Sequence, residues 1–200
     1  PNPVQGNVVA FNGSGGIAVF GNPVSGSGEA NTGNTIEGNS IFLNGRSSTT
    51  TPLLGIDLTN SFPYPVDDGF TPNDSKGHGA ANDPNNFQNF PIITSVTLPP
   101  GGGTTITGTL TQSVSPNTTF RVELFSNTSD PLGLPAEGQV FLGFATVTTN
   151  AGGMGSFSVT VPATLVKGQT VTATATDPAG STSEFSLGVI PQGSITVTGT

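Results

Sequence analysis

Carboxylates are the side chains of this sequence best suited to chemistry, with twelve Asp and Glu against four Lys and Arg. Glu29, Glu37 and Asp57 are the acids of the first 60 residues, where Arg46 is the one cation. A carboxylate pair aided by a cation or by calcium can cleave polysaccharides through acid–base chemistry. Few chemical partners accompany Glu37 and Asp57, and isolated acids on a solvated face are the simpler interpretation. We therefore assign no catalytic residue.

Acids of a loop-rich segment form a second group that could bind calcium. Asp and Asn supply the hard oxygen ligands that Ca²⁺ takes. The candidate ligands are Asp67, Asp68, Asp74 and Asp83, with Asn73 and Asn82 beside them. Their spacing does not match the EF-hand pattern, and Asx residues before Gly or Pro also form turns without metal. Calcium is therefore the one cofactor that the sequence suggests, and turn formation is the alternative.

Composition excludes other chemistries. Cysteine is absent and His78 is the single histidine, so neither a catalytic triad nor a zinc–thiolate site is expected. The formal net charge is −8, and four scattered cations cannot supply the counterion release of nucleic-acid binding. No apolar run approaches the roughly 20 residues of a membrane-spanning helix. We therefore expect no nucleic-acid partner and no membrane span.

Asparagines followed by Ser or Thr two residues later are candidate sites of glycan attachment. The matches to this N-x-[ST] rule are Asn12, Asn73, Asn117 and Asn127. A chain rich in Asn and Thr also produces such matches by chance. Glycans are therefore candidate partners, and whether any of the four asparagines carries one is left open.

The first 60 residues contain an internal repeat. Residues 2–13 and 34–45 share the pattern N-x-[VI]-x-G-N-x-[VI]-x-x-N-G. Residues 16–19 and 55–58 share a second element, G-I-[AD]-[VL]. Each unit predicts very short strands that meet at Gly-Asn and Asn-Gly corners, because Gly and Asn tolerate a left-handed backbone.

These strings resemble the right-handed parallel β-helix of the pectate-lyase-like superfamily. The resemblance covers about residues 1–60 and implies roughly two coils of a solenoid. It implies an architecture and says little about activity. A pair of unrelated Gly/Asn-rich hairpins is the alternative.

Residues 61–91 show neither a strand period nor a helix period. A structureless stretch of this length is unusual in a compact domain. The segment is rich in aromatic residues, which suggests a cap folded over the last coil: Phe62, Tyr64, Phe70, Phe87 and Phe90.

From residue 92 onward, apolar and polar residues alternate with a period of two. The expected strands are 92–98, 104–111, 119–126, 140–148, 155–161, 170–176 and 183–187. Such strands with Pro/Gly/Asn turns predict an immunoglobulin-like (Ig-like) antiparallel sandwich, and 171–185 resembles the closing hairpin of bacterial Ig-like surface modules. The alternation places these residues in its core: Ile106, Leu110, Val122, Leu124, Phe157, Val159, Val171 and Ala173.

The sequence thus predicts an all-β chain of four parts. These are a short right-handed parallel β-helix over 1–60, a capping or linker loop over 61–91, an Ig-like antiparallel β-sandwich over 92–190 and a C-terminal extension strand over 191–200. An end coil exposes unpaired backbone groups, and 195–200 is a spare alternating strand suited to pairing with them. Both features predict head-to-tail self-association; the alternative is a fragment whose upstream coils cover the open end.

The function expected from these features is a non-enzymatic extracellular or cell-surface protein with a structural or adhesive role, including the subunit of a surface filament. Two alternatives stay open. One is a carbohydrate-active β-helix enzyme fragment or a carbohydrate-binding module. The other is an ice- or surface-binding protein that uses two rows of outward threonines: Thr105, Thr107, Thr109 and Thr111, and Thr170, Thr172, Thr174 and Thr176.

Overall fold

The computed structural model describes residues 6–21, 31–45, 53–60, 69–74, 83–111, 115–129, 135–166 and 168–193. Within these ranges the chain is all-β, with one short 3₁₀ turn and no α-helix. The elements are β1 (Val8–Ala10), β2 (Ile17–Phe20), β3 (Ser40–Phe42), β4 (Ile56–Thr59), η2 (Pro84–Phe87), β5 (Ile92–Leu98), β6 (Thr104–Leu110), β7 (Thr119–Asn127), β8 (Val140–Thr148), β9 (Gly155–Val161), β10 (Thr170–Thr176) and β11 (Gln192–Gly193).

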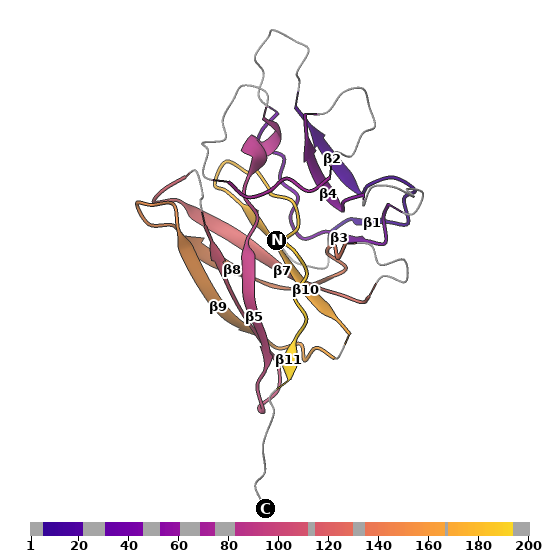
Figure 1. The fold of residues 1–200 in the computed structure, drawn as a ribbon, viewed down its shortest axis with the longest axis vertical. Coiled ribbons are helices and arrows are strands. Elements are labelled where there is room, and N and C mark those ends of the chain that lie inside the picture. Colours follow the sequence, from indigo (N-terminus) through magenta and orange to yellow (C-terminus); the bar gives the residue numbers. More distant parts are fainter. Residues whose placement is uncertain are drawn as a thin grey trace, which may run out of the picture.

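Two sheets form a β-sandwich from residue 92 onward (Figure 1). One has the strand order β10-β7-β8 and is antiparallel, and the other has the order β11-β5-β6-β9, in which only the β11–β5 pair is parallel. Alternate residues of each strand point between the sheets, as the period of two predicts. The predicted core is confirmed: seven of its eight residues are buried there, and Val159 is partly buried against them.

The segment expected as a strand over 183–187 is not a regular strand. The segment runs antiparallel beside β10, and isolated β-bridges join Thr176 to Thr182 and Val171 to Val189. The hydroxyls of two serines accept hydrogen bonds from β10 N–H groups, Ser183 from Ala175 and Ser186 from Ala173, each at 2.9 Å. Side chains therefore replace backbone carbonyls along this edge, which breaks the ladder.

The repeat of the first 60 residues pairs in parallel. β1 lies beside β3 with Val8 opposite Ser40, and β2 lies beside β4 with Ile17 opposite Ile56. The resemblance to the pectate-lyase-like parallel β-helix is nevertheless wrong. The described residues hold two parallel pairs of two strands each, and the other sheets are largely antiparallel. The repeat supplies only two copies, and Ile41 of the second copy bridges antiparallel to Gly138 of the sandwich instead of to another coil.

The parallel pairs pack on the outer face of the β10-β7-β8 sheet (Figure 1). A second apolar cluster joins the two regions: Val19, Ile36, Ile41, Ile56 and Leu58 from the repeat region, with Phe125 and Phe185 from the sandwich. Thr172, Thr174 and Thr176 of β10 are buried, so the expected outward threonine row on this strand is wrong. The hydroxyl partners of two of these threonines lie outside β10: Thr172 donates to the Glu137 carbonyl, and Thr176 is hydrogen-bonded to Thr182.

Candidate functional site

Three glutamates of the sandwich are buried beneath the repeat region. Glu123 lies on β7, Glu137 precedes β8, and Glu184 follows β10, and each is at most 6% exposed. A buried carboxylate is costly unless hydrogen bonds or charges surround it. All three meet this requirement by accepting hydrogen bonds from backbone N–H groups of residues 38–71.

Glu123 is the centre of a charged cluster. Its Oε2 accepts the N–H of Gly38 at 2.8 Å, and its Oε1 accepts Nε and Nη2 of Arg121 at 3.0 and 2.8 Å. The Arg121 guanidinium also lies 3.6 Å from Oε2 of Glu37 and 3.8 Å from the centroid of the Phe144 ring. Arg121 therefore balances two acids, one from each region, and stacks on an aromatic ring.

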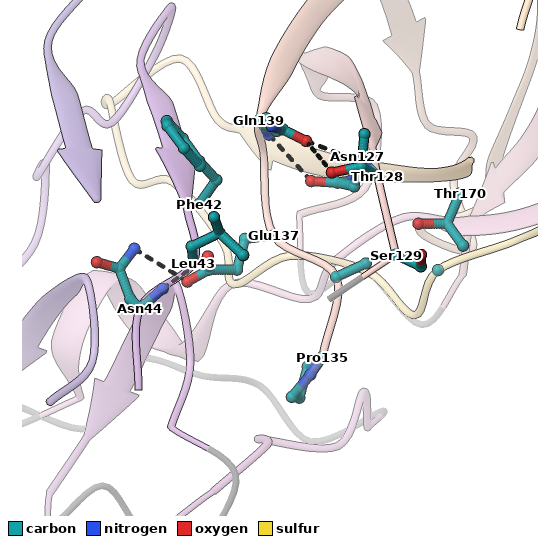
Figure 2. A pocket seen from close by; sticks show the side chains of 12 residues that line it. Phe42, Leu43, Asn44, Asn127, Thr128, Ser129, Pro135, Glu137, Gln139 and Thr170 are labelled. Atoms are coloured by element: carbon teal, nitrogen blue, oxygen red, sulfur yellow. Dashed lines mark hydrogen bonds between the residues drawn. The ribbon is translucent and has the colours of Figure 1, made fainter. Parts of the chain in front are cut away.

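Glu137 binds the second copy of the repeat (Figure 2). Its Oε2 accepts the backbone N–H of Asn44 at 3.2 Å, and its Oε1 accepts Asn44 Nδ2 at 3.1 Å. The backbone carbonyl of Glu137 accepts the Thr172 hydroxyl of β10. A Cβ at Gly55 would lie 2.9 Å from Glu137 Oε1, so this carboxylate also requires glycine there.

Glu184 joins two further segments. Its Oε1 accepts the N–H of Leu58 on β4 at 3.1 Å, and its Oε2 accepts the N–H of Thr71 at 3.0 Å. Asn85 of η2 acts similarly with an amide: its Nδ2 donates to the carbonyls of Asn34 and Thr182 at 2.9 and 2.8 Å. Beside its apolar cluster, the interface thus contains polar side chains that satisfy backbone groups.

A pocket of about 310 Å³ opens at the Glu137 end of this interface. Figure 2 shows Phe42, Leu43 and Asn44 on one wall and Asn127, Thr128 and Gln139 on the other. The polar groups of the second wall bind one another: Gln139 Oε1 accepts the N–H and hydroxyl of Thr128, both at 2.9 Å. A mostly apolar pocket of about 270 Å³ lies beside it and reaches Glu184 and Phe185.

The structure separates the two acids that were considered for catalysis. Glu37 is half-buried and faces Arg121, so it is not an isolated solvated acid. Asp57 of β4 is buried, and its expected position on a solvated face is wrong. Neither acid lines the two pockets at the interface.

Two of the four calcium candidates, Asp74 and Asp83, lie in the described part of the chain. Asp67 and Asp68 lie outside the described residues, as do Glu29, Arg46, His78 and Asn82. Among the residues that the structure does describe, no group of three or more His, Cys, Asp or Glu could hold a metal. Near Asp74 and Asp83, two asparagines bind backbone instead: Asn73 Nδ2 donates to the Phe90 carbonyl, and Asn89 Nδ2 to the Asp74 carbonyl, both at 2.8 Å.

The glycosylation candidates differ in what their amide nitrogen does. Nδ2 of three of them donates inside the fold: Asn12 to Asn44, Asn73 to Phe90 and Asn127 to Thr172. Asn117 is exposed at the turn before β7 and has a left-handed backbone with φ of 53°. The structure therefore distinguishes Asn117 from the other three.

Sequence reasoning missed the buried glutamates as a group. A signal was present in β7, where Phe120, Val122 and Leu124 alternate with Arg121 and Glu123. Phe125 breaks this alternation, and the pairing with β8 shifts between Leu124 and Phe125. An apolar residue on the second face of a strand indicates that both faces are covered.

No protein-family model matches this sequence, and no curated protein matches it. Within the described ranges, no helix combines the length and the apolar character that crossing a bilayer requires.

Proposed function

We propose that this chain is a non-enzymatic structural module of an extracellular or cell-surface protein with an adhesive role. One observation carries the proposal: the three buried glutamates bind backbone N–H groups across the interface between the repeat region and the sandwich. Carboxylates that accept these hydrogen bonds hold the repeat region and the sandwich together.

The architecture supports the same role. Strands β5, β6 and β9 oppose β7, β8 and β10, residues 182–189 run antiparallel along β10, and β11 lies parallel to β5. This arrangement favours the Ig-like type of sandwich, which often serves as a spacer or adhesive unit at cell surfaces. Charged residues make up only 8% of the chain, and cysteine is absent.

The proposal is tested by activity and stability together. The purified chain is incubated with neutral and acidic polysaccharides, and we expect no release of reducing ends or unsaturated products. Depolymerisation that Glu137→Gln or Glu184→Gln abolishes in a folded variant would show that these carboxylates are catalytic and would overturn the proposal.

A second candidate function is attachment to an uncharged ordered surface such as ice. The outer face of the β5-β6-β9 sheet carries hydroxyl rows, with Thr97 opposite Thr105 and Thr105 opposite Thr160. The hydroxyls of Thr105 and Thr160 are 2.8 Å apart. Measurable thermal hysteresis that Thr105→Lys removes would support this function, and no hysteresis in the wild type would exclude it.

A further inference from the structure

Stacked asparagines connect the two copies of the repeat. Asn7 lies on Asn39, and the Oδ1 of Asn39 accepts both the N–H and the Nδ2 of Asn7, at 3.0 and 3.1 Å. Asn12 lies on Asn44 in the same way, with distances of 3.3 and 2.8 Å to Asn44 Oδ1. One amide oxygen thus receives two donors from the asparagine of the neighbouring strand.

The asparagine pairs form a ladder across the two copies of the repeat. On the side of Asn44, the sandwich provides the last acceptor of this ladder. Asn44 directs the same two donors, its N–H and its Nδ2, at the Glu137 carboxylate. The order is therefore Asn12, Asn44, Glu137, and a carboxylate occupies the place that a third asparagine would take. The Asn44–Glu137 contact thus repeats the two-donor pattern of the asparagine pairs.

The other side of the ladder has no partner among the residues that the structure describes. Asn7 and Asn12 are exposed, and within the described part of the chain no donor reaches the Oδ1 of either residue. The carbonyl of Asn7 accepts the N–H of Ser40, and that of Val9 accepts Asn44 Nδ2. Because backbone groups of successive strand residues point to opposite edges, the N–H and C=O of Val8 face away from β3.

Apolar side chains accompany this open edge. Val8 is 70% exposed and Phe11 66% exposed, and the Phe11 ring makes an edge contact with Phe42 at 5.5 Å. No charged residue lies on β1, although charges are a common protection of edge strands. The edge therefore offers backbone groups, two amide oxygens and apolar surface at once, which suits strand addition.

We propose that the outer edge of β1 binds an extended polypeptide strand that runs parallel to β1 and carries two asparagines five residues apart. The spacing is that of Asn7 and Asn12, and also of Asn39 and Asn44. Each partner asparagine donates its N–H and its Nδ2 to the Oδ1 of Asn7 or Asn12, as Asn7 and Asn12 donate to Asn39 and Asn44.

The partner strand is not a second folded copy of this chain. The asparagines of this spacing on β1 and β3 already use their Nδ2 donors inside the fold: Asn7 on Asn39, Asn12 on Asn44, Asn39 on the Glu37 carbonyl, and Asn44 on Val9 and Glu137. A partner must bring donors of its own. The inference rests on these contacts and is independent of the proposed structural role.

Binding is tested with a labelled synthetic peptide of residues 34–45 added to the full chain. We expect saturable binding by fluorescence anisotropy, and slower hydrogen exchange at the amides of Val8 and Ala10. The matched peptide with Asn39→Ala and Asn44→Ala should bind at least about tenfold more weakly, because it lacks the side-chain donors.

Protein variants locate the site. Val8→Lys should weaken binding about tenfold, because a lysine on the edge must be desolvated by the added strand. Val166→Lys is the matched control, since Val166 is 62% exposed away from β1, and it should leave binding unchanged. Equal affinity of the two peptides, no saturation, or equal effects of both lysines would overturn the proposal. Self-association of the chain that Val8→Lys abolishes would also overturn it, because a second copy would then occupy the edge.

Discussion

At the scale of single residues, the acids of this chain divide by what they contact. Glu123, Glu137 and Glu184 each accept backbone N–H groups from the repeat region, whereas Glu37 lies half-buried beside the Arg121 guanidinium that Glu123 also binds. Hydrogen bonds to a buried charge contribute more than neutral ones, and their loss leaves a desolvated donor behind. Mutation should therefore affect the two kinds of acid differently.

We expect Glu137→Ala to lower the free energy of unfolding by about 2–4 kcal/mol, because the N–H and Nδ2 of Asn44 lose their acceptor inside the interface. Denaturant titration measures this change. The control is Glu37→Ala, whose half-buried carboxylate lies 3.6 Å from Arg121, and it should cost less than Glu137→Ala because this contact is longer than a hydrogen bond. Equal costs would contradict the structural role of Glu137.

When the chain is secreted from a host that glycosylates asparagine, we expect the folded protein to carry its glycan on Asn117. Asn117 is exposed, whereas Asn127 Nδ2 is buried against the Thr172 hydroxyl. A glycan on Asn127 would prevent this packing. Mass spectrometry of glycopeptides measures occupancy, Asn117→Gln should remove it, and a native monomer modified at Asn127 would contradict the prediction.

At the scale of elements, short segments are joined by close backbone approaches. Gly138 forms the antiparallel bridge to Ile41 on β3, with both backbone hydrogen bonds, at 2.9 and 2.8 Å. A Cβ at Gly138 would lie 2.5 Å from the Phe185 ring. Glycine at this position lets the repeat region and the sandwich share one backbone pairing.

Gly138→Ala should lower the free energy of unfolding by about 1–3 kcal/mol, because the added methyl must displace the buried Phe185 ring. Thermal unfolding followed by circular dichroism detects the change as a lower Tm. Gly101→Ala is the control, since nothing lies within 4 Å of its Cβ position and its φ is not in the left-handed region. A Tm that falls equally in both variants would show that the contact with Phe185 is unimportant.

At the scale of the whole molecule, one apolar cluster spans the repeat region and the sandwich. Phe125 is buried at its centre, with ring contacts to Phe141 at 5.9 Å and to Phe185 at 5.5 Å. Burial of large rings supplies much of the free energy that joins two regions. The two regions should therefore unfold together.

We expect a single unfolding transition, with calorimetric and van't Hoff enthalpies in agreement. Phe125→Ala should cost about 3–5 kcal/mol and should speed hydrogen exchange both in β4 and in β7. Phe144→Ala is the control, because that ring is half exposed and outside the cluster. Two separate transitions in the wild type, or faster exchange in β7 alone, would show that the regions unfold independently.

Local patterns of the sequence determined much of the fold. Six of the seven sandwich strands were predicted within one residue of their observed bounds, because a strand with one buried face must alternate. The two repeated sequence elements determined which short strands pair, since equivalent residues lie opposite each other, Val8 beside Ser40 and Ile17 beside Ile56. The strand expected over 183–187 is not regular: Ser183 and Ser186 still donate their N–H groups to β10, but their hydroxyls replace backbone carbonyls as acceptors.

Only the tertiary structure decided what lies on the second face of the β10-β7-β8 sheet. The threonines of β10 and the glutamates 123, 137 and 184 have the sequence context of solvated residues, yet all are buried or half-buried. Their partners come from segments up to 126 residues away. The period of two in a strand indicates that its two faces differ. Which segment covers a face depends on long-range packing, and no local pattern encodes that.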